Sequence, residues 1–140
     1  MLLKIRKIHP DAKIPRYAHY DDAGFDLCAV ENTLLKVGQR LPVSTGIAME
    51  IPEGYVGLIW DKSGLAVNQG IKTMAGVIDS TYRGEILVAV INLSDKDYIF
   101  EKGHKVAQMI IQKKEMAEFE EVENLTDTLR GVGGLGSTGK

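Results

Sequence analysis

A single carboxylate, Asp79, stands out in the segment Gly76–Ile86, whose sequence is GVIDSTYRGEI. It follows Val77 and Ile78 in the pattern of a buried strand, where an unpaired carboxylate is costly unless it has a partner or a function. A carboxylate held beside a water molecule can act as a general base, so Asp79 is a candidate catalytic residue. An Asx turn would also explain an aspartate at this position, and the segment by itself leaves both interpretations open.

The last eleven residues, Arg130–Lys140, form a second candidate site because their sequence, RGVGGLGSTGK, suits a phosphate group. Glycine-rich backbone offers N–H groups to phosphate oxygens, the Arg130 guanidinium is a planar charged donor, and Ser137 and Thr138 add hydroxyls. The letters match both GxxxxGK and GxGxxG, but those motifs need a strand before the glycines and a helix after them. No residues follow Lys140 in this sequence to form that helix, so we reject both assignments. A terminal segment without a role is the alternative interpretation.

The composition is that of a globular protein: 140 residues, 44% of them hydrophobic, with a net charge of -2. A charge so close to zero argues against nucleic-acid binding through bulk electrostatics. No apolar run reaches the ~18–20 residues that a membrane span needs, and the N-terminus lacks the apolar core of a signal peptide. Cys28 is the only cysteine, which excludes an intrachain disulfide and fits a reducing compartment. We therefore expect a cytoplasmic protein that binds neither nucleic acid nor membrane.

The elements that would position these residues are mostly strands, because apolar residues recur with a period of two. Residues 46–51 alternate in this way, and residues 85–92 are continuously apolar, as in a strand buried on both faces. Further strands are expected at residues 55–60, 97–100, 105–112 and 118–122, with one helical turn at residues 63–69. About ten short strands separated by turns predict an all-β jelly roll or distorted β-barrel. We place the jelly-roll domain at residues 1–124, and a linker with a flexible glycine-rich C-terminal arm at residues 125–140.

Five short segments, taken in order, resemble the five motifs of the trimeric deoxyuridine triphosphatase (dUTPase) family. They are AGFDLCA at residues 23–29, DKSGLA at 61–66, GVIDSTYRGEI at 76–86, KGHKVAQ at 102–108 and RGVGGLGSTG at 130–139. One such segment would carry little weight, whereas five in the family order are specific. The resemblance implies hydrolysis of dUTP to dUMP and pyrophosphate by a jelly-roll homotrimer. Each of its three active sites would draw residues from all three subunits.

The resemblance also implies a role for each of two carboxylates. Asp79 would be the general base that activates water for attack on the α-phosphate. Asp26 would hold a Mg²⁺ ion through its water shell, while the triphosphate supplies the direct ligands. Magnesium usually keeps several waters and uses few carboxylates, which agrees with this arrangement.

Substrate-binding residues follow from the same resemblance. The backbone of Gly76, Val77 and Ile78 would read the uracil edge in a tight hairpin with no room for the thymine methyl group. Tyr82 would pack beneath the deoxyribose and exclude a ribose. Thr73 occupies a position where some bacterial members carry a uracil-contacting asparagine. The residues expected around the phosphates and in the covering arm are Lys62, Ser63, Gly64, Gln108, Arg130, Leu135, Gly136, Ser137 and Thr138.

Some of these positions depart from the usual family pattern. Lys62 replaces an arginine, and His104–Lys105 replaces an acidic residue and an arginine. A lysine supplies a positive charge but cannot form the bidentate hydrogen bonds of an arginine. Leu135 replaces the phenylalanine that usually caps the uracil ring, so aromatic stacking worth about 0.5–1.5 kcal/mol is lost. These differences bear on substrate affinity more than on the type of reaction.

Two other functions are compatible with the same fold. A dCTP deaminase would carry a glutamate ten residues after Asp79, where this chain has Ala89, and a Pro-Gly in place of Ser80–Thr81. A non-catalytic nucleotide-binding regulator would have lost a carboxylate or the arginine of the tail, whereas Asp26, Asp79 and Arg130 are all present. Both alternatives are therefore less favoured than dUTP hydrolysis.

Overall fold

Nearly all regular structure in the computed structural model, which describes residues 1–135, is β-strand. In chain order the elements are β1 Lys4–Lys7, β2 Phe25–Cys28, β3 Thr33–Leu35, β4 Arg40–Glu50, β5 Tyr55–Trp60, α1 Ser63–Gln69, β6 Ile71–Met74, β7 Val77–Ile78, β8 Glu85–Asn92, β9 Tyr98–Phe100 and β10 Lys105–Lys113.

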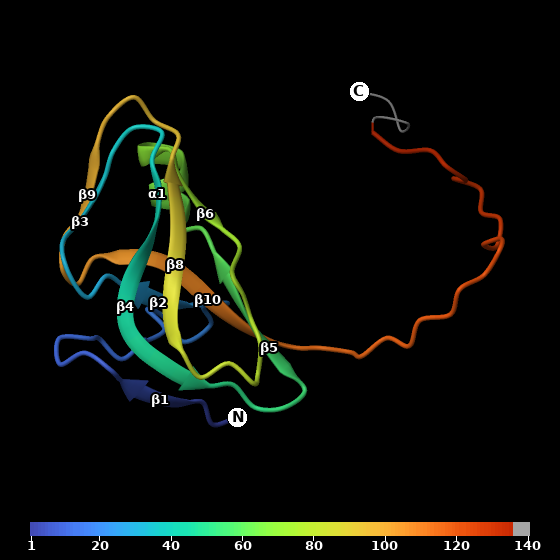
Figure 1. Cartoon of the computed structure of the whole chain (residues 1–140), viewed down its shortest axis with the longest axis horizontal. Helices are drawn as coiled ribbons and strands as arrows, with labels where there is room; N and C mark the ends of the chain where they lie inside the picture. Colours follow the sequence, from blue (N-terminus) through green and yellow to red (C-terminus); the bar gives the residue numbers. More distant parts are fainter. Residues whose placement is uncertain (136–140) are drawn as a thin grey trace.

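Two four-stranded sheets and one small two-stranded sheet make up the fold (Figure 1). The strand orders are β1-β4-β8-β6 and β2-β10-β5-β7, and β3 pairs with β9. Every strand pair is antiparallel. The all-β jelly-roll prediction is therefore confirmed. Of the two forms predicted, the structure of residues 1–135 has open sheets packed as a sandwich and not a closed barrel.

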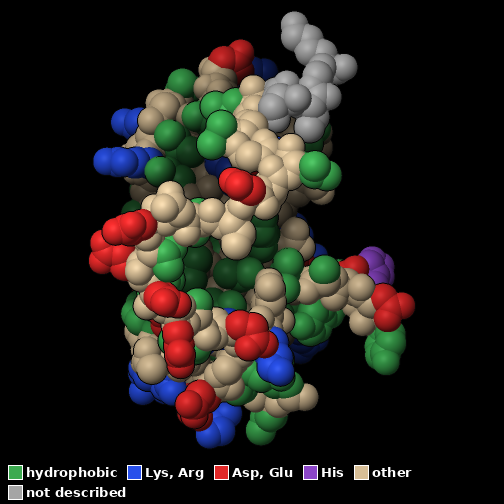
Figure 2. Space-filling view, turned by 90° about the vertical axis from the view of Figure 1, so that its right-hand side faces the viewer, with side chains coloured by type: hydrophobic (Ala, Val, Ile, Leu, Met, Phe, Trp, Pro, Cys, Tyr) green, Lys and Arg blue, Asp and Glu red, His purple; other side chains and the backbone are tan. Residues whose placement is uncertain are grey.

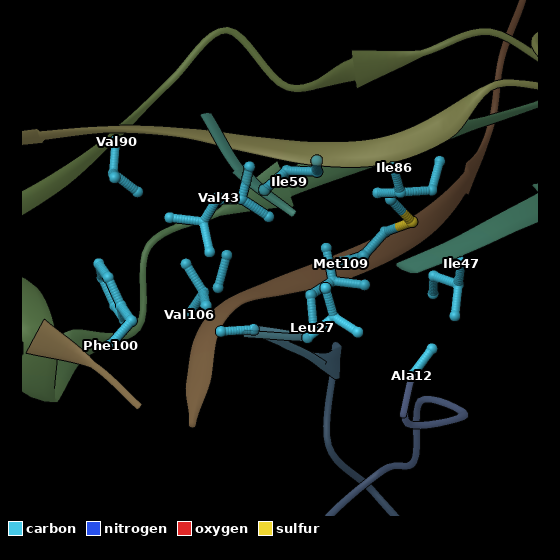
Figure 3. Close-up of a cluster of buried hydrophobic side chains, with 14 of the residues drawn as sticks. Ala12, Leu27, Val43, Ile47, Ile59, Ile86, Val90, Phe100, Val106 and Met109 are labelled. Atoms are coloured by element: carbon cyan, nitrogen blue, oxygen red, sulfur yellow. The ribbon is translucent and has the colours of Figure 1, made fainter. Parts of the chain in front are cut away.

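The core lies between the two large sheets, because alternate side chains of each strand point inward. Figure 3 shows Ile86 and Val90 of β8 and Val43 of β4 on one side of this core, with Val106 and Met109 of β10 facing them. All five side chains are buried. Burial of an aliphatic side chain contributes about 1.5–3 kcal/mol, so this layer fixes the strands that carry the candidate site.

Several predicted elements have the expected bounds, including β5 at residues 55–60, α1 at 63–69 and β8 at 85–92. The prediction that β8 is buried on both faces is wrong. Burial alternates along the strand, and Leu87 is 43% exposed, because β8 packs against the opposite sheet with one face only. The strand predicted at residues 118–122 is also absent from the structure, where Phe119 is 96% exposed. A strand needs a partner for its backbone hydrogen bonds, and no described segment of this chain pairs with these residues.

The chain leaves the sheets after β10 ends at Lys113, and residues 114–135 carry no helix or strand. Figure 1 shows this segment in orange and red, extending away from the two sheets. Figure 2 looks at the side from which it leaves and shows acidic side chains interspersed with apolar ones. The domain boundary placed at residue 124 stays a prediction. No helix in residues 1–135 has the length and apolar character needed to cross a membrane.

Candidate active site

Two lysines, Lys62 and Lys105, converge on the carboxylate of Asp26 in a group called here the Asp26 cluster. Asp26 lies on β2, Lys62 directly precedes α1 and Lys105 begins β10. Lys62 Nζ lies 2.5 Å from Asp26 Oδ1, and Lys105 Nζ lies 2.6 Å from Asp26 Oδ2. The Asp26 side chain is only 12% exposed, so both ion pairs are partly shielded from water. Three segments distant in the sequence therefore meet at one carboxylate.

The ionisation of this cluster is set by its geometry. Burial alone would raise the pKa of Asp26, but the hydrogen bonds from Lys105 and Lys62 outweigh it and leave the pKa below its usual value. The hydrogen bond to Asp26 in turn raises the pKa of Lys105. With one carboxylate and two ammonium groups, the cluster carries a net positive charge at neutral pH. Such a cluster suits the oxygens of a phosphate group.

Each carboxylate oxygen of Asp26 already accepts a hydrogen bond from a lysine. A carboxylate oxygen has a second lone pair, which can accept a hydrogen bond from metal-bound water. No group of three or more histidine, cysteine, aspartate or glutamate residues within positions 1–135 could enclose a metal ion. The residues therefore fit the predicted magnesium role of Asp26 in its outer-shell form.

Gln108 lies next to the Asp26 cluster in the middle of its sheet. On β10 it is opposite Asp26 of β2 on one side and Trp60 of β5 on the other. Its Nε2 donates a hydrogen bond to the carbonyl oxygen of Asp61 at 2.9 Å. Gly24 packs close to this side chain, since a Cβ at residue 24 would lie 3.1 Å from Gln108 Oε1. A glycine before β2 thus leaves room for the glutamine.

Asp61 is a functional candidate that the sequence analysis missed, although it opens the second motif-like segment. Its Oδ1 accepts hydrogen bonds from the Thr73 backbone N–H at 2.7 Å and from Thr73 Oγ1 at 2.6 Å. Its Oδ2 forms an ion pair with Lys72 Nζ at 2.7 Å. The sequence did place an aspartate between a predicted strand and the predicted phosphate-binding residues. Spacing alone, however, does not reveal which residues this aspartate contacts.

The segment Ile71–Ile78, called here the β6–β7 segment, contains the residues predicted to read the base. It is not the tight hairpin that was expected, because β6 pairs with β8 in one sheet and β7 pairs with β5 in the other. The chain crosses between the sheets at Gly76, whose φ is 108°, and Ile59 N–H donates to Gly76 O at 2.8 Å. A Cβ at residue 76 would lie 2.9 Å from Ile59 Cβ, so only glycine fits this crossing. The crossing forms one wall of a small hollow of about 170 Å³, which is also lined by Trp60, Thr73 and Val77.

Asp79 and Tyr82 follow this segment in a turn. The Tyr82 N–H donates to the Asp79 carbonyl oxygen at 3.1 Å, and the Tyr82 hydroxyl donates to the Glu85 carbonyl oxygen at 3.0 Å. Asp79 is exposed, which corrects the expected buried-strand setting, because β7 is a two-residue strand at the edge of its sheet. The hydrogen bonds among residues 1–135 include none to the Asp79 carboxylate, so the Asx-turn interpretation gains no support.

A single chain does not bring all the predicted site residues together. The strands β10 and β5 lie between β2, which carries Asp26, and β7, which precedes Asp79. At about 4.8 Å per strand spacing, these two edges are about 14 Å apart. Ser63 and Gly64 are exposed at the start of α1, near Lys62.

The C-terminal candidates lie apart from both edges. Arg130 Nε donates to the carbonyl oxygen of Gly133 at 2.8 Å, and Leu135 is fully exposed. Neither residue contacts the Asp26 cluster. The remaining arm candidates, Gly136, Ser137 and Thr138, lie outside the described residues.

Comparisons with known proteins all point to one family. The family model for dUTPase matches residues 10–139 of the chain. The deoxyuridine 5'-triphosphate nucleotidohydrolase of Nautilia profundicola is 46% identical over 142 aligned positions, covering 100% of both chains. A solved mutant dUTPase of Staphylococcus bacteriophage 80alpha with dUpNHpp has a TM-score of 0.94 at 26% identity and 99% coverage of both chains. A solved mutant dUTPase from phage phi11 of S. aureus, described as coordinating a structural Mg(II) ion, has a TM-score of 0.85 at 25% identity, covering 91% of this chain and 100% of its own.

Proposed function

The chain belongs to the dUTPase family, and from this we propose that it hydrolyses dUTP to dUMP and pyrophosphate. The observation that carries the proposal is the Asp26 cluster, where two lysines from separate segments converge on one shielded carboxylate beside Gln108. The resulting positive charge is placed to bind a triphosphate. The β6–β7 segment offers a separate, glycine-dependent hollow for the base.

In this proposal Asp79 is the general base that takes a proton from the attacking water as the bond to the α-phosphorus forms. The turn that fixes its backbone, through Tyr82 N–H, leaves the carboxylate exposed and able to reach a bound substrate. Proton transfer to a positioned side chain typically contributes about 10²–10⁴-fold to a rate. Removal of that carboxylate should therefore stop turnover without disturbing the core.

The substrate contacts are assigned to three groups of residues. Lys62, Ser63, Gly64 and Gln108 would bind the phosphates, as donors fixed before charge moves in the transition state. The backbone of Gly76, Val77 and Ile78 would read the base, with Thr73 beside it and Tyr82 beneath the deoxyribose. Arg130, Leu135, Gly136, Ser137 and Thr138 would close over the nucleotide from the C-terminal arm.

Magnesium is the proposed cofactor, held by Asp26 through water. A bound Mg²⁺ would neutralise part of the triphosphate charge and orient its oxygens. The Asp26 carboxylate, already fixed by Lys62 and Lys105, would accept hydrogen bonds from the waters of the ion. This outer-shell role agrees with the preference of Mg²⁺ for keeping its waters.

A homotrimer with shared active sites is the proposed assembly. The two sheet edges that carry Asp26 and Asp79 are separated by about 14 Å, which supports a site completed by a second copy of the chain. Exposed apolar side chains at Val77, Leu87 and Phe119 would be covered in such an assembly. The cytoplasm is the proposed location, on the basis of the single cysteine.

The dCTP deaminase alternative is not favoured, because Ala89 stands on β8 where that reaction would need a carboxylate. Ala89 is a small apolar residue between Pro42 and Met74 in the sheet. A non-catalytic regulator is not favoured either, since Asp79 and Arg130 are present in the sequence and Asp26 is in contact with Lys62 and Lys105.

A pyrophosphate-release assay with dUTP, dTTP, UTP and dCTP, each with and without Mg²⁺, tests the proposal. We expect release from dUTP far above the other three nucleotides, and only with Mg²⁺. Ammonia release from dCTP would instead support the deaminase. Nucleotide binding without any product would support the regulator.

A further inference from the structure

Asp61 occupies a junction between the two subsites of the proposed function. It directly follows β5, and its carboxylate reaches across to β6, which belongs to the opposite sheet. The contacts with Thr73 and Lys72 span 2.6–2.7 Å, and the Asp61 side chain is only partly exposed. A side chain that bridges two sheets fixes their relative position where the chain crosses between them.

Residues at the same end of β5 also contact Gly76, where the chain crosses between the sheets, and the residues proposed to bind phosphate. Ile59 N–H donates to Gly76 O at 2.8 Å, so β5 fixes the β6–β7 segment at both Thr73 and Gly76. The Asp61 carbonyl oxygen accepts from Gln108 Nε2, and its neighbour Lys62 pairs with Asp26. Asp61 thus joins the base hollow to the residues proposed to bind phosphate.

The contact with Asp61 also decides what the Thr73 hydroxyl can offer to a ligand. A threonine hydroxyl has one proton and two acceptor lone pairs. An ionised carboxylate can only accept, so the 2.6 Å contact takes the single proton of Thr73 Oγ1. Thr73 lines the hollow beside Gly76 and Val77, and toward a base placed there its hydroxyl can act only as an acceptor.

A hydroxyl that can only accept a hydrogen bond distinguishes uracil from cytosine if it faces N3 of the base. The N3 position of uracil or thymine carries a proton and donates, whereas N3 of cytosine is an acceptor. An acceptor facing an acceptor leaves both groups unpaired, which is costly in a site with little water. We propose that Asp61 is a positioning residue that fixes the Thr73 hydroxyl as an acceptor for the N3–H of uracil, and so disfavours cytosine. This inference rests on the proposed function and deepens it.

The test compares base preference in four variants with that of the unaltered protein. Asp61→Ala frees the Thr73 hydroxyl to donate, and Thr73→Val removes it with little change of volume. Thr73→Ser keeps the hydroxyl, and Glu50→Gln serves as a control because Glu50 is another lysine-paired carboxylate that does not line the hollow. For each protein, kcat and KM are measured with dUTP, dCTP and dTTP. Binding of the α,β-imido analogues of dUTP and dCTP is followed by the fluorescence of Trp60, the only tryptophan.

We expect Asp61→Ala and Thr73→Val to lower the preference for dUTP over dCTP by about tenfold, mainly through KM. The preference for dUTP over dTTP should change by less than about twofold, since uracil and thymine carry the same N3–H donor. Glu50→Gln should behave like the unaltered protein, and Thr73→Ser should keep the preference for dUTP over dCTP because it keeps the hydroxyl. The inference is overturned if the dCTP preference does not move, or if the dTTP preference falls equally, because equal losses indicate general loosening.

The two proposals can fail separately. A chain that does not hydrolyse dUTP contradicts the proposed function, yet its binding preference between the two imido analogues still tests the role of Asp61. A chain that hydrolyses dUTP but keeps its base preference in both variants contradicts the role of Asp61 alone.

Discussion

Replacing Asp26 with asparagine tests the physical account of the Asp26 cluster. Asparagine keeps the shape of the side chain but removes the charge that holds Lys62 and Lys105 at 2.5 and 2.6 Å. Hydrogen bonds to charged groups contribute about 1.5–3 kcal/mol, and breaking a fully buried ion pair costs about 3–5 kcal/mol. Because the Asp26 side chain is 12% exposed, breaking its ion pairs should cost less than breaking a fully buried pair. We expect Asp26→Asn to lower the free energy of unfolding by about 2–3 kcal/mol at pH 7.

The pH dependence of this loss has a definite sign. The folded pKa of Asp26 lies below its unfolded value of about 3.9, so its ionised form stabilises the folded state above that pH. The stabilisation is lost as the pH falls through the folded pKa, where Asp26 in the unaltered protein also becomes neutral. The difference between the two proteins should therefore be full at pH 7 and shrink below about pH 4.

The assay is urea unfolding followed by circular dichroism, at equal protein concentration because assembly contributes to stability. Glu50→Gln is the matched control: its lysine partner, Lys4, lies 2.9 Å away, but both side chains are largely exposed. We expect little change in that variant, as for most surface ion pairs. A loss for Asp26→Asn under about 0.5 kcal/mol at pH 7, or one that is the same at pH 3 and pH 7, would refute the reasoning.

Three further predictions concern single features of the site. Asp79→Asn should abolish dUTP hydrolysis while leaving the melting temperature and binding of the imido analogue nearly unchanged, because Asp79 is exposed; near-normal turnover would contradict its role as the base. Removing residues 130–140 should leave the circular dichroism spectrum intact but cut turnover severely, since β10 ends before them; full activity would make the arm dispensable. Gly76→Ala should lower the free energy of unfolding by about 2 kcal/mol or more, because alanine is strained at a φ of 108° and its Cβ would lie 2.9 Å from Ile59 Cβ. Gly54→Ala is its control, because Gly54 also has a positive φ (79°) but a Cβ there would meet nothing within 4 Å; equal losses in urea unfolding would refute the packing argument.

The parts of the fold that depend on local pattern could be predicted from the sequence. The bounds of β5 follow from the apolar run YVGLIW and the turn signal before it, and a helical turn was predicted at the residues of α1. Partners distant in the sequence could not be predicted in the same way. Residues 118–122 were predicted as a strand, yet the described chain offers them no neighbour to pair with.

The candidate site shows the same division. Lys62 and Gln108 could be chosen from their motif-like segments, but their contacts with Asp26 and Asp61 depend on how the strands are ordered in the sheet. The hairpin expected at Gly76 followed from the family resemblance, whereas in the structure the chain crosses there between the two sheets. Asp61 was overlooked because a carboxylate shows its role through its hydrogen-bond partners, and these lie across the two sheets.

The central claim is that the chain hydrolyses dUTP in a site built from more than one copy. Co-expression of Asp79→Asn with the chain lacking residues 130–140, followed by the pyrophosphate-release assay, tests it most directly. Each variant alone should be nearly inactive, whereas mixed assemblies should recover activity, because some sites combine Asp79 from one copy with the arm of another. If each site lay within a single chain, no site in the mixture would hold both parts. Mixed assemblies as inactive as the two separate variants would contradict the account.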